Sequence, residues 1–198
     1  MKKTTILCLL LFCFLNTYTQ IIASPEKFTY LIRDAIGDLN NDGRTDYATI
    51  SMDTTDENRP LKLEIFFAEE NKNLKRVFSS TETIEAMYPK RLNGEVNESN
   101  IPDLFIEEGK LILYFFINGN SLYDFKYKNG NFELINFSYV QWDGKNITET
   151  DFNLVTGKYS KISEILNTDE ITLNIKKKEK IRPLPQLKNF KPFTNELF

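Results

Sequence analysis

The sequence predicts an all-β protein built as an antiparallel meander, and it leaves open whether the sheet closes as a sandwich, a barrel or a propeller-like sheet. Two observations carry this prediction. After residue 105 an X-Gly dipeptide recurs every 10 to 14 residues, at Gly109, Gly119, Gly130, Gly144 and Gly157. The segments between these glycines are rich in β-branched and aromatic residues, a pattern typical of strands joined by tight turns.

Residues 1–19 are predicted to be a signal peptide. Lys2 and Lys3 precede an apolar run at residues 6–15, as in secretory signals. We expect cleavage before Gln20 and a secreted, periplasmic or cell-envelope location. The apolar run is shorter than the roughly 20 residues that cross a membrane, and no later run approaches that length. We therefore expect no membrane span.

Cysteine and histidine are excluded from the chemistry of the exported chain. The two cysteines, Cys8 and Cys13, lie in the predicted signal peptide, and the sequence has no histidine. A lipid anchor on Cys13 is disfavoured, because Phe12 precedes it where a lipoprotein signal needs a small residue. The exported part is thus expected to lack disulfides, Cys or His metal ligands, and Ser-His-Asp or Cys-His nucleophiles.

Residues 20–198 have the usual size of one domain. We expect a β-rich body over residues 20–175 and a C-terminal strap, containing Lys and Pro, over residues 176–198, where three prolines oppose a regular element. The apolar residues expected to pack the strap on the body are Leu184, Leu187, Phe190 and Phe193. The net charge of −3, more negative without Lys2 and Lys3, argues against nucleic acid as a partner.

The first half of the body is expected to contain three clear strands, at residues 47–52, 62–67 and 74–78, with the last two paired as a hairpin. Residues 30–36 fit either a strand or a short helix. One short helix is predicted at residues 80–88, because a Ser or Thr cap, acidic residues in the first turn and a following proline flank this segment.

Two hairpins in the second half allow their strand register to be predicted. A two-residue turn at residues 129–130 places Tyr127 opposite Phe132, Lys126 opposite Glu133, and Phe125 opposite Leu134. A turn at residues 108–109 places Glu107 opposite Lys110, Ile106 opposite Leu111, and Phe105 opposite Ile112. Residues 111–117 are predicted to be a central strand buried on both faces, and residues 171–175 the last strand.

Residues 38–46 carry the one chemically specific pattern, Asp-x-Asn-x-Asp-Gly-x-x-Asp. Calcium takes roughly six to eight oxygen ligands, and alternating acidic or amide side chains followed by Gly wrap them around the ion. Gly43 permits the sharp turn, and we expect the Arg44 side chain to face water. The predicted calcium ligands are Asp38, Asn40, Asp42, Arg44 through its backbone carbonyl, and Asp46.

The segment from Gly37 to Ala48 resembles the calcium loop of the FG-GAP/VCBS repeats, the integrin-α-like propeller repeats, in which such a loop runs into a strand. The resemblance covers residues 37–52, and it implies the same five ligands and bound calcium as the cofactor. The family repeats this loop once per blade, whereas one copy is found here. An EF-hand is disfavoured, because Thr49 stands where a bidentate Glu belongs. The chain also resembles small exported bacterial proteins that carry one such loop.

The alternative for residues 38–46 is an Asx-rich turn that binds nothing, since Asp, Asn and Gly are common turn residues. Three carboxylates within nine residues would repel one another without a cation, which favours calcium. The protein side chains would then fill most of the coordination sphere. We therefore expect a structural role for the ion and not a catalytic one.

The sequence favours an exported, calcium-binding, non-enzymatic β-domain that acts as a binding or structural module, with an envelope protein or glycan as partner. The alternative is a carboxylate-dependent, glycosidase-like hydrolase, which needs two acidic residues roughly 5–9.5 Å apart. Acidic residues are too abundant for any pair to stand out, so no catalytic residue is assigned. Trp142, beside a predicted turn, fits either a core position or an exposed ring that stacks on a sugar.

Overall fold

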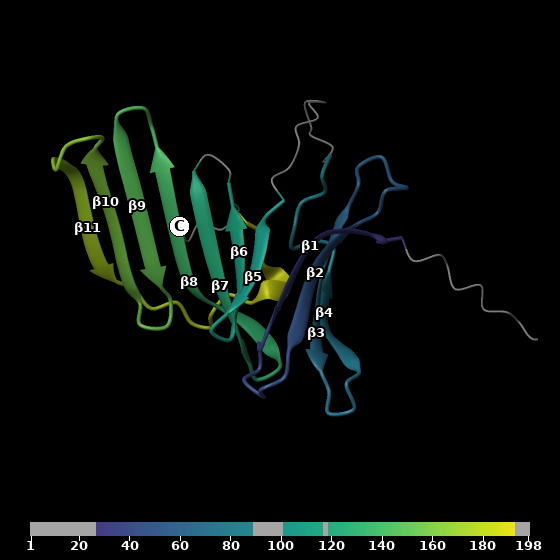
Figure 1. Cartoon of the computed structure of the whole chain (residues 1–198). Coiled ribbons are helices and arrows are strands. Elements are labelled where there is room, and N and C mark those ends of the chain that lie inside the picture. The colour runs from purple at the N-terminus through teal and green to yellow at the C-terminus, as the bar shows by residue number, and fades with distance from the viewer. Residues whose placement is uncertain (1–26, 89–100, 117–118, 193–198) are drawn as a thin grey trace, which may run out of the picture.

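The structure is a computed structural model that describes residues 27–88, 101–116 and 119–192. In this part of the chain, eleven β-strands form two antiparallel sheets of four and seven strands, and the single helix is a three-residue 3-10 turn. The prediction of an all-β antiparallel fold is therefore confirmed. Both sheets are open, and neither closes into a barrel (Figure 1).

The small sheet contains the first four strands in the order β1-β2-β3-β4, so each strand pairs with its neighbour in sequence. Residues 30–36, which fitted either a strand or a helix, belong to β1, and the three strands predicted in this region all form. The bounds are β1 Tyr30–Gly37, β2 Asp46–Met52, β3 Leu61–Ala68 and β4 Leu74–Ser80.

The large sheet contains the other seven strands, again as a meander in which β5 and β11 are the outermost strands. The last strand runs to Lys178, three residues into the predicted strap. The bounds are β5 Asp103–Glu107, β6 Lys110–Phe115, β7 Asn120–Lys128, β8 Asn131–Trp142, β9 Asn146–Asn153, β10 Lys158–Ile165 and β11 Ile171–Lys178.

Both predicted hairpin registers are confirmed. In β7 and β8, Tyr127, Lys126 and Phe125 pair with Phe132, Glu133 and Leu134. In β5 and β6, Glu107, Ile106 and Phe105 pair with Lys110, Leu111 and Ile112. The central turn residues Asn129 and Gly130 have φ values of 50° and 82°, as a type I′ turn requires. Local turn chemistry therefore sets the register of these strands.

The predicted helix at residues 80–88 is wrong. Ser80 ends β4, and its hydroxyl accepts hydrogen bonds from the amides of Glu82 and Thr83, so the local cap forms without a helix behind it. The backbone amides of Met87 and Tyr88 donate to the β2–β3 loop instead of to the preceding turn of a helix. Among the described residues, no helix is long and apolar enough to cross a membrane.

One hydrophobic core lies between the two sheets. The small sheet contributes alternate residues of β2 and β3, and the large sheet contributes alternate residues of β6 and β7. These fully buried side chains are Ala48, Ile50, Leu61, Leu63, Ile65, Leu111, Leu113, Phe115, Tyr123 and Phe125. Strands β9 to β11 lie at the end of the large sheet farthest from the small sheet (Figure 1).

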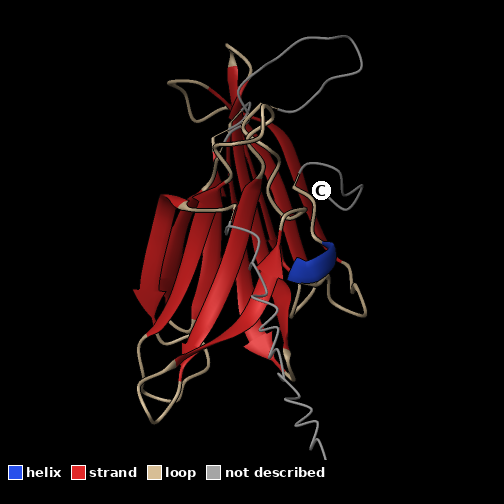
Figure 2. Cartoon of the chain, turned by 90° about the vertical axis from the view of Figure 1, so that its right-hand side faces the viewer, coloured by secondary structure: helices blue, strands red, loops and turns tan. Residues whose placement is uncertain are grey.

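The C-terminal strap packs on the large sheet, as predicted for its apolar residues. After β11 the chain returns to β8, where the Leu134 amide donates to the Pro185 carbonyl at 2.8 Å. The 3-10 helix Leu187–Asn189, blue in Figure 2, follows, and Leu187 is buried. The Phe190 ring lies 4.8 Å from that of Tyr123. Leu184 is partly buried, whereas Phe193 lies outside the described residues.

Candidate metal site

The predicted calcium loop connects β1 to β2, and one of its own side chains anchors it to the hydrophobic core. Leu39, the second residue of the loop, is fully buried in the core. Asn41 and Gly43 have φ values of 59° and 80°, so the chain reverses through the left-handed region where the motif places its glycine. The predicted sharp turn therefore forms at Gly43.

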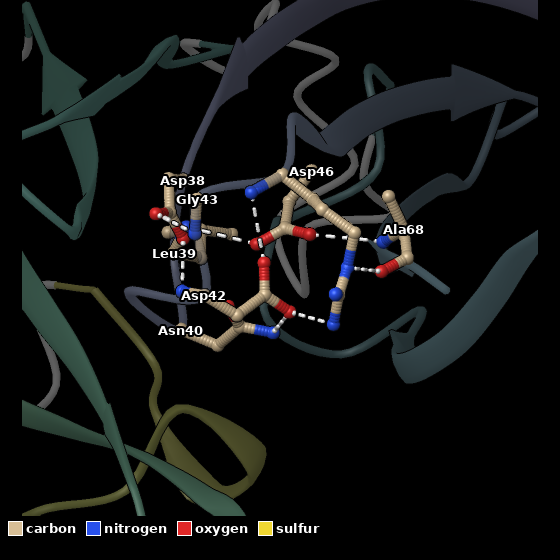
Figure 3. Close-up of polar contacts among 8 residues, drawn as sticks. Asp38, Leu39, Asn40, Asp42, Gly43, Asp46 and Ala68 are labelled. Atoms are coloured by element: carbon tan, nitrogen blue, oxygen red, sulfur yellow. Dashed lines mark hydrogen bonds and ion pairs between the residues drawn. The ribbon is translucent and has the colours of Figure 1, made fainter. Parts of the chain in front are cut away.

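Asp38 ties the two halves of the loop together. Its Oδ1 accepts a hydrogen bond from the Asp42 amide at 3.1 Å, and its Oδ2 accepts one from the Gly43 amide at 2.8 Å (Figure 3). Each carboxylate oxygen has two lone pairs, and each of these contacts uses one. Asp38 therefore retains an acceptor site on both oxygens.

Asp42 is the most heavily bonded acid of the loop. Its Oδ2 accepts from Asn40 Nδ2 at 2.8 Å and from Arg44 Nη2 at 2.6 Å. Its Oδ1 accepts from the Arg44 amide at 2.9 Å. The expectation that the Arg44 side chain faces water holds only in part: the side chain is 39% exposed, but its guanidinium folds back over the loop and its Nε donates to the Ala68 carbonyl at 2.8 Å.

Asp46 is fully buried and joins the loop to the rest of the small sheet. Its Oδ2 accepts a hydrogen bond from the Leu39 amide, and its Oδ1 accepts one from the Ala68 amide, both at 2.9 Å (Figure 3). Ala68 ends β3, far from the loop in sequence. Asp46 therefore holds the loop against the β3–β4 turn as well as closing the motif.

The acids of the loop differ in their electrostatics. Burial raises the pKa of Asp46, and the charges of Asp42 and Asp38 raise it further, against the two backbone hydrogen bonds. Burial also acts to raise the pKa of Asp42, but hydrogen bonds from the Arg44 amide and Asn40, together with the Arg44 charge, lower it overall. Asp42 thus favours its charged form and depends on Arg44 as its counter-charge.

The donor set fits calcium in its chemistry. Three carboxylates, one amide oxygen and one backbone carbonyl are the hard oxygen ligands that calcium takes. In the structure these carboxylates accept hydrogen bonds from the loop itself, and among the described residues no group of three or more acidic, His or Cys side chains is gathered around a metal position. Asp42 Oδ1 retains one acceptor site, whereas Oδ2 is filled by Asn40 and the Arg44 guanidinium, so an ion that also takes Oδ2 would displace the guanidinium.

The loop also lies against the large sheet. A Cβ atom added at Gly109, in the β5–β6 turn, would lie 2.8 Å from Asn41 Oδ1. A Cβ atom added at Gly37 would lie 2.5 Å from Ile106 Cγ2. Both contacts join the end of β1 and the loop to the β5–β6 hairpin. The loop therefore sits where the two sheets meet. The contact with Ile106 requires glycine at position 37, and the φ of 70° favours it at position 109.

Two partners of the loop were missed by the sequence analysis. Ala68 takes part only through its backbone, so no sequence signal could have identified it. The loop-facing side chain of Arg44 was missed because the motif uses only the backbone carbonyl of this residue and therefore does not predict where its side chain points. The exposed ring of Trp142, at 64% exposure, settles the alternative left open for this residue: it is not a core position.

No protein-family model, curated protein or solved structure with which we compared the chain matches it. The case for calcium therefore depends on the residues of the loop and on their surroundings in the fold.

Proposed function

We propose that the chain is an exported, calcium-binding β-domain that works without catalysis, as a binding or structural module. The observation that carries this proposal is the position of the loop at residues 38–46. It joins β1 to β2, its buried Asp46 bonds to the end of β3, and its Asn41 lies against Gly109 of the large sheet. An ion held there would stabilise the contact between the two sheets.

The composition of the chain supports a stabilising metal. A chain exported after loss of residues 1–19 would contain no cysteine, so disulfides could not compensate for loss of core packing. Three acidic side chains at one loop repel one another, and Arg44 supplies a single positive charge among them. A divalent cation would relieve this repulsion and raise the free energy of unfolding.

Thermal unfolding with calcium and with EGTA tests the proposal. At calcium roughly ten times its Kd, linkage adds about 1.4 kcal/mol, which for a chain of this size raises the Tm by about 3–6 °C. Asp42→Ala should abolish this shift, because it removes the ligand at the centre of the motif.

The matched control is Asp143→Ala. Asp143 also organises a tight turn, since its Oδ1 accepts from the amides of Lys145 at 2.9 Å and Asn146 at 2.6 Å, but that turn joins β8 to β9. This variant should lower the Tm and keep the full calcium shift. Equal Tm values of the native chain in calcium and EGTA would refute calcium binding.

A further inference from the structure

A recess of about 480 Å³ opens on the outer face of the small sheet, directly beside the calcium loop. This volume lies within the range of about 300–1,000 Å³ that is usual for ligand sites. The side chains that matter to its chemistry come from the loop, from β2, from the β3–β4 connection and from the start of β4. They are Arg44, Tyr47, Glu69, Glu70, Lys72 and Leu74. We call it the loop-side recess.

The loop-side recess has an apolar part that is exposed without a partner in the described chain. Tyr47 is 38% exposed and Leu74 is 50% exposed. Tyr47 pairs directly across the sheet with Ile36, which is 60% exposed, so the apolar surface continues from the recess onto β1. Adjacent strands lie roughly 4.8 Å apart, and the surface therefore suits a ligand longer than one ring.

The polar part of the loop-side recess balances its charges. Glu69 and Glu70 supply carboxylate acceptors, and Arg44 and Lys72 supply cationic donors. A lipid-like ligand would cover Glu69, Glu70 and Lys72 without offering them hydrogen-bond partners, which is costly. A strongly charged ligand would meet as many like charges as opposite ones. The lining therefore favours a neutral ligand that is rich in both donors and acceptors.

The position of the recess disfavours an extended peptide. Tyr47 belongs to β2, which pairs with β1 on one side and β3 on the other, so an added strand cannot pair with the backbone beside Tyr47. Within the recess, strand addition could occur only along β4, which begins at Leu74, and it would leave Tyr47 uncovered. A sugar ring matches the recess, because its C–H face can lie on Tyr47 and Leu74 while its hydroxyls donate to carboxylates and accept from cations.

The recess shares two groups with the calcium loop. The Arg44 Nε donates to the Ala68 carbonyl at 2.8 Å, and the Ala68 amide donates to the buried Asp46. Arg44 is also the counter-charge of Asp42. A calcium ion that takes over Asp42 would release one end of the guanidinium towards the recess, so ligand binding and calcium binding would be linked.

We propose that the loop-side recess binds a neutral saccharide chain, with Tyr47 as its stacking platform and with an affinity that calcium increases. This inference rests on the proposed function, because it names the partner class of the proposed binding module. The saccharide platform is Tyr47 and not Trp142, a more exposed aromatic, since Tyr47 lines a recess with balanced polar groups around it.

An NMR titration tests this site. The ¹⁵N-labelled protein is titrated with hexasaccharides of glucose, xylose and mannose, each to about 10 mM, a concentration that detects even millimolar affinity. For one of the three, saturable shifts should appear at the amides of residues 44–47 and 68–74. Tyr47→Ala should weaken this binding about tenfold or more, whereas Trp142→Ala should leave it unchanged. EGTA should weaken it in the native chain, whereas in Asp42→Ala, which also frees the Arg44 guanidinium, EGTA should have no effect on it.

Several outcomes would overturn the inference while leaving the calcium proposal intact, because that proposal is read from the Tm. No shift with any of the three hexasaccharides would do so. Loss of binding in Trp142→Ala with full binding in Tyr47→Ala would move the site to the β8–β9 turn. Binding to the native chain that is the same in calcium and in EGTA would remove the calcium dependence. Cleavage of the saccharide would replace a binding module with a hydrolase.

Discussion

Arg44 is a single residue whose side chain competes with the cation for the Asp42 carboxylate. Its backbone carbonyl is an expected calcium ligand, yet its guanidinium occupies the Asp42 carboxylate that calcium needs. The two roles reside in different parts of the residue, so a substitution can separate them. Arg44→Ala keeps the carbonyl and removes the competing charge.

We expect Arg44→Ala to tighten calcium binding about two- to fivefold, the size of a partly exposed ion pair, and to lower the Tm without calcium because the bond to Ala68 is lost. Isothermal titration calorimetry gives the Kd. The matched control is Arg33→Ala, which removes an exposed ion pair to Asp103 at 3.0 Å outside the loop and should leave the Kd unchanged. Weaker calcium binding in Arg44→Ala would contradict the competition.

Asp124 of β7 is a residue whose charged form destabilises the folded state. Burial raises its pKa, and Glu107 and Glu108 raise it further, while Lys110 at 3.5 Å lowers it. Its Oδ1 is buried and has no hydrogen-bond partner among the described residues. Because its folded-state pKa lies above its unfolded value, ionised Asp124 costs stability at neutral pH, and this cost disappears as the pH falls through the raised pKa towards the ordinary value.

Asp124→Asn should therefore raise the free energy of unfolding at pH 7, by a few tenths to about 1 kcal/mol, and should have little effect near pH 3, where the native carboxyl is also neutral. Urea denaturation at both pH values measures this difference. Asp151→Asn, on an exposed side chain of β9, is the control and should change neither value. A loss of stability at pH 7 would show that the pair with Lys110 outweighs the burial.

The strap adds a buried aromatic ring to the core of the large sheet. Phe190 is 2% exposed, and its ring lies 4.8 Å from Tyr123 and 5.0 Å from Phe125, both in the centre of the large sheet. Phe190 thus belongs to the same core as the side chains that the small sheet packs against the large sheet. The strap, which contains no long regular element, is part of the core.

Phe190→Ala should lower the free energy of unfolding by about 3–5 kcal/mol, the usual cost of removing a buried aromatic ring. Phe116→Ala removes an equal side chain that is 52% exposed, and it should cost much less. Guanidinium denaturation of both variants makes the comparison. Similar midpoints for the two would mean that the strap does not contribute to the cooperative core.

How well an element could be predicted depended on how local its determinants are. The β5–β6 and β7–β8 registers follow from a two-residue turn and alternating side chains, and both were predicted correctly. The helix at residues 80–88 had local signals too, yet the amides of Met87 and Tyr88 found acceptors in the β2–β3 loop. Tertiary hydrogen bonds outweighed the local preference there.

The same limit holds for the candidate site at the scale of the whole molecule. The motif placed Asp38, Asp42 and Asp46 in one turn, but nothing in it names Ala68 as the partner of Asp46, or Gly109 as the neighbour of Asn41. The division of eleven strands into a four-stranded and a seven-stranded sheet was equally out of reach. Contacts between segments distant in sequence determine the Asp46–Ala68 bond, the Asn41–Gly109 contact and the division into two sheets.

The contact of Phe190 with Tyr123 and Phe125 has a consequence for the time order of folding. The ring that covers the middle of the large sheet is synthesised only after all eleven described strands. Until that ring arrives, the nascent chain lacks a piece of its core. The core of the large sheet should therefore be completed only after its seven strands have been made.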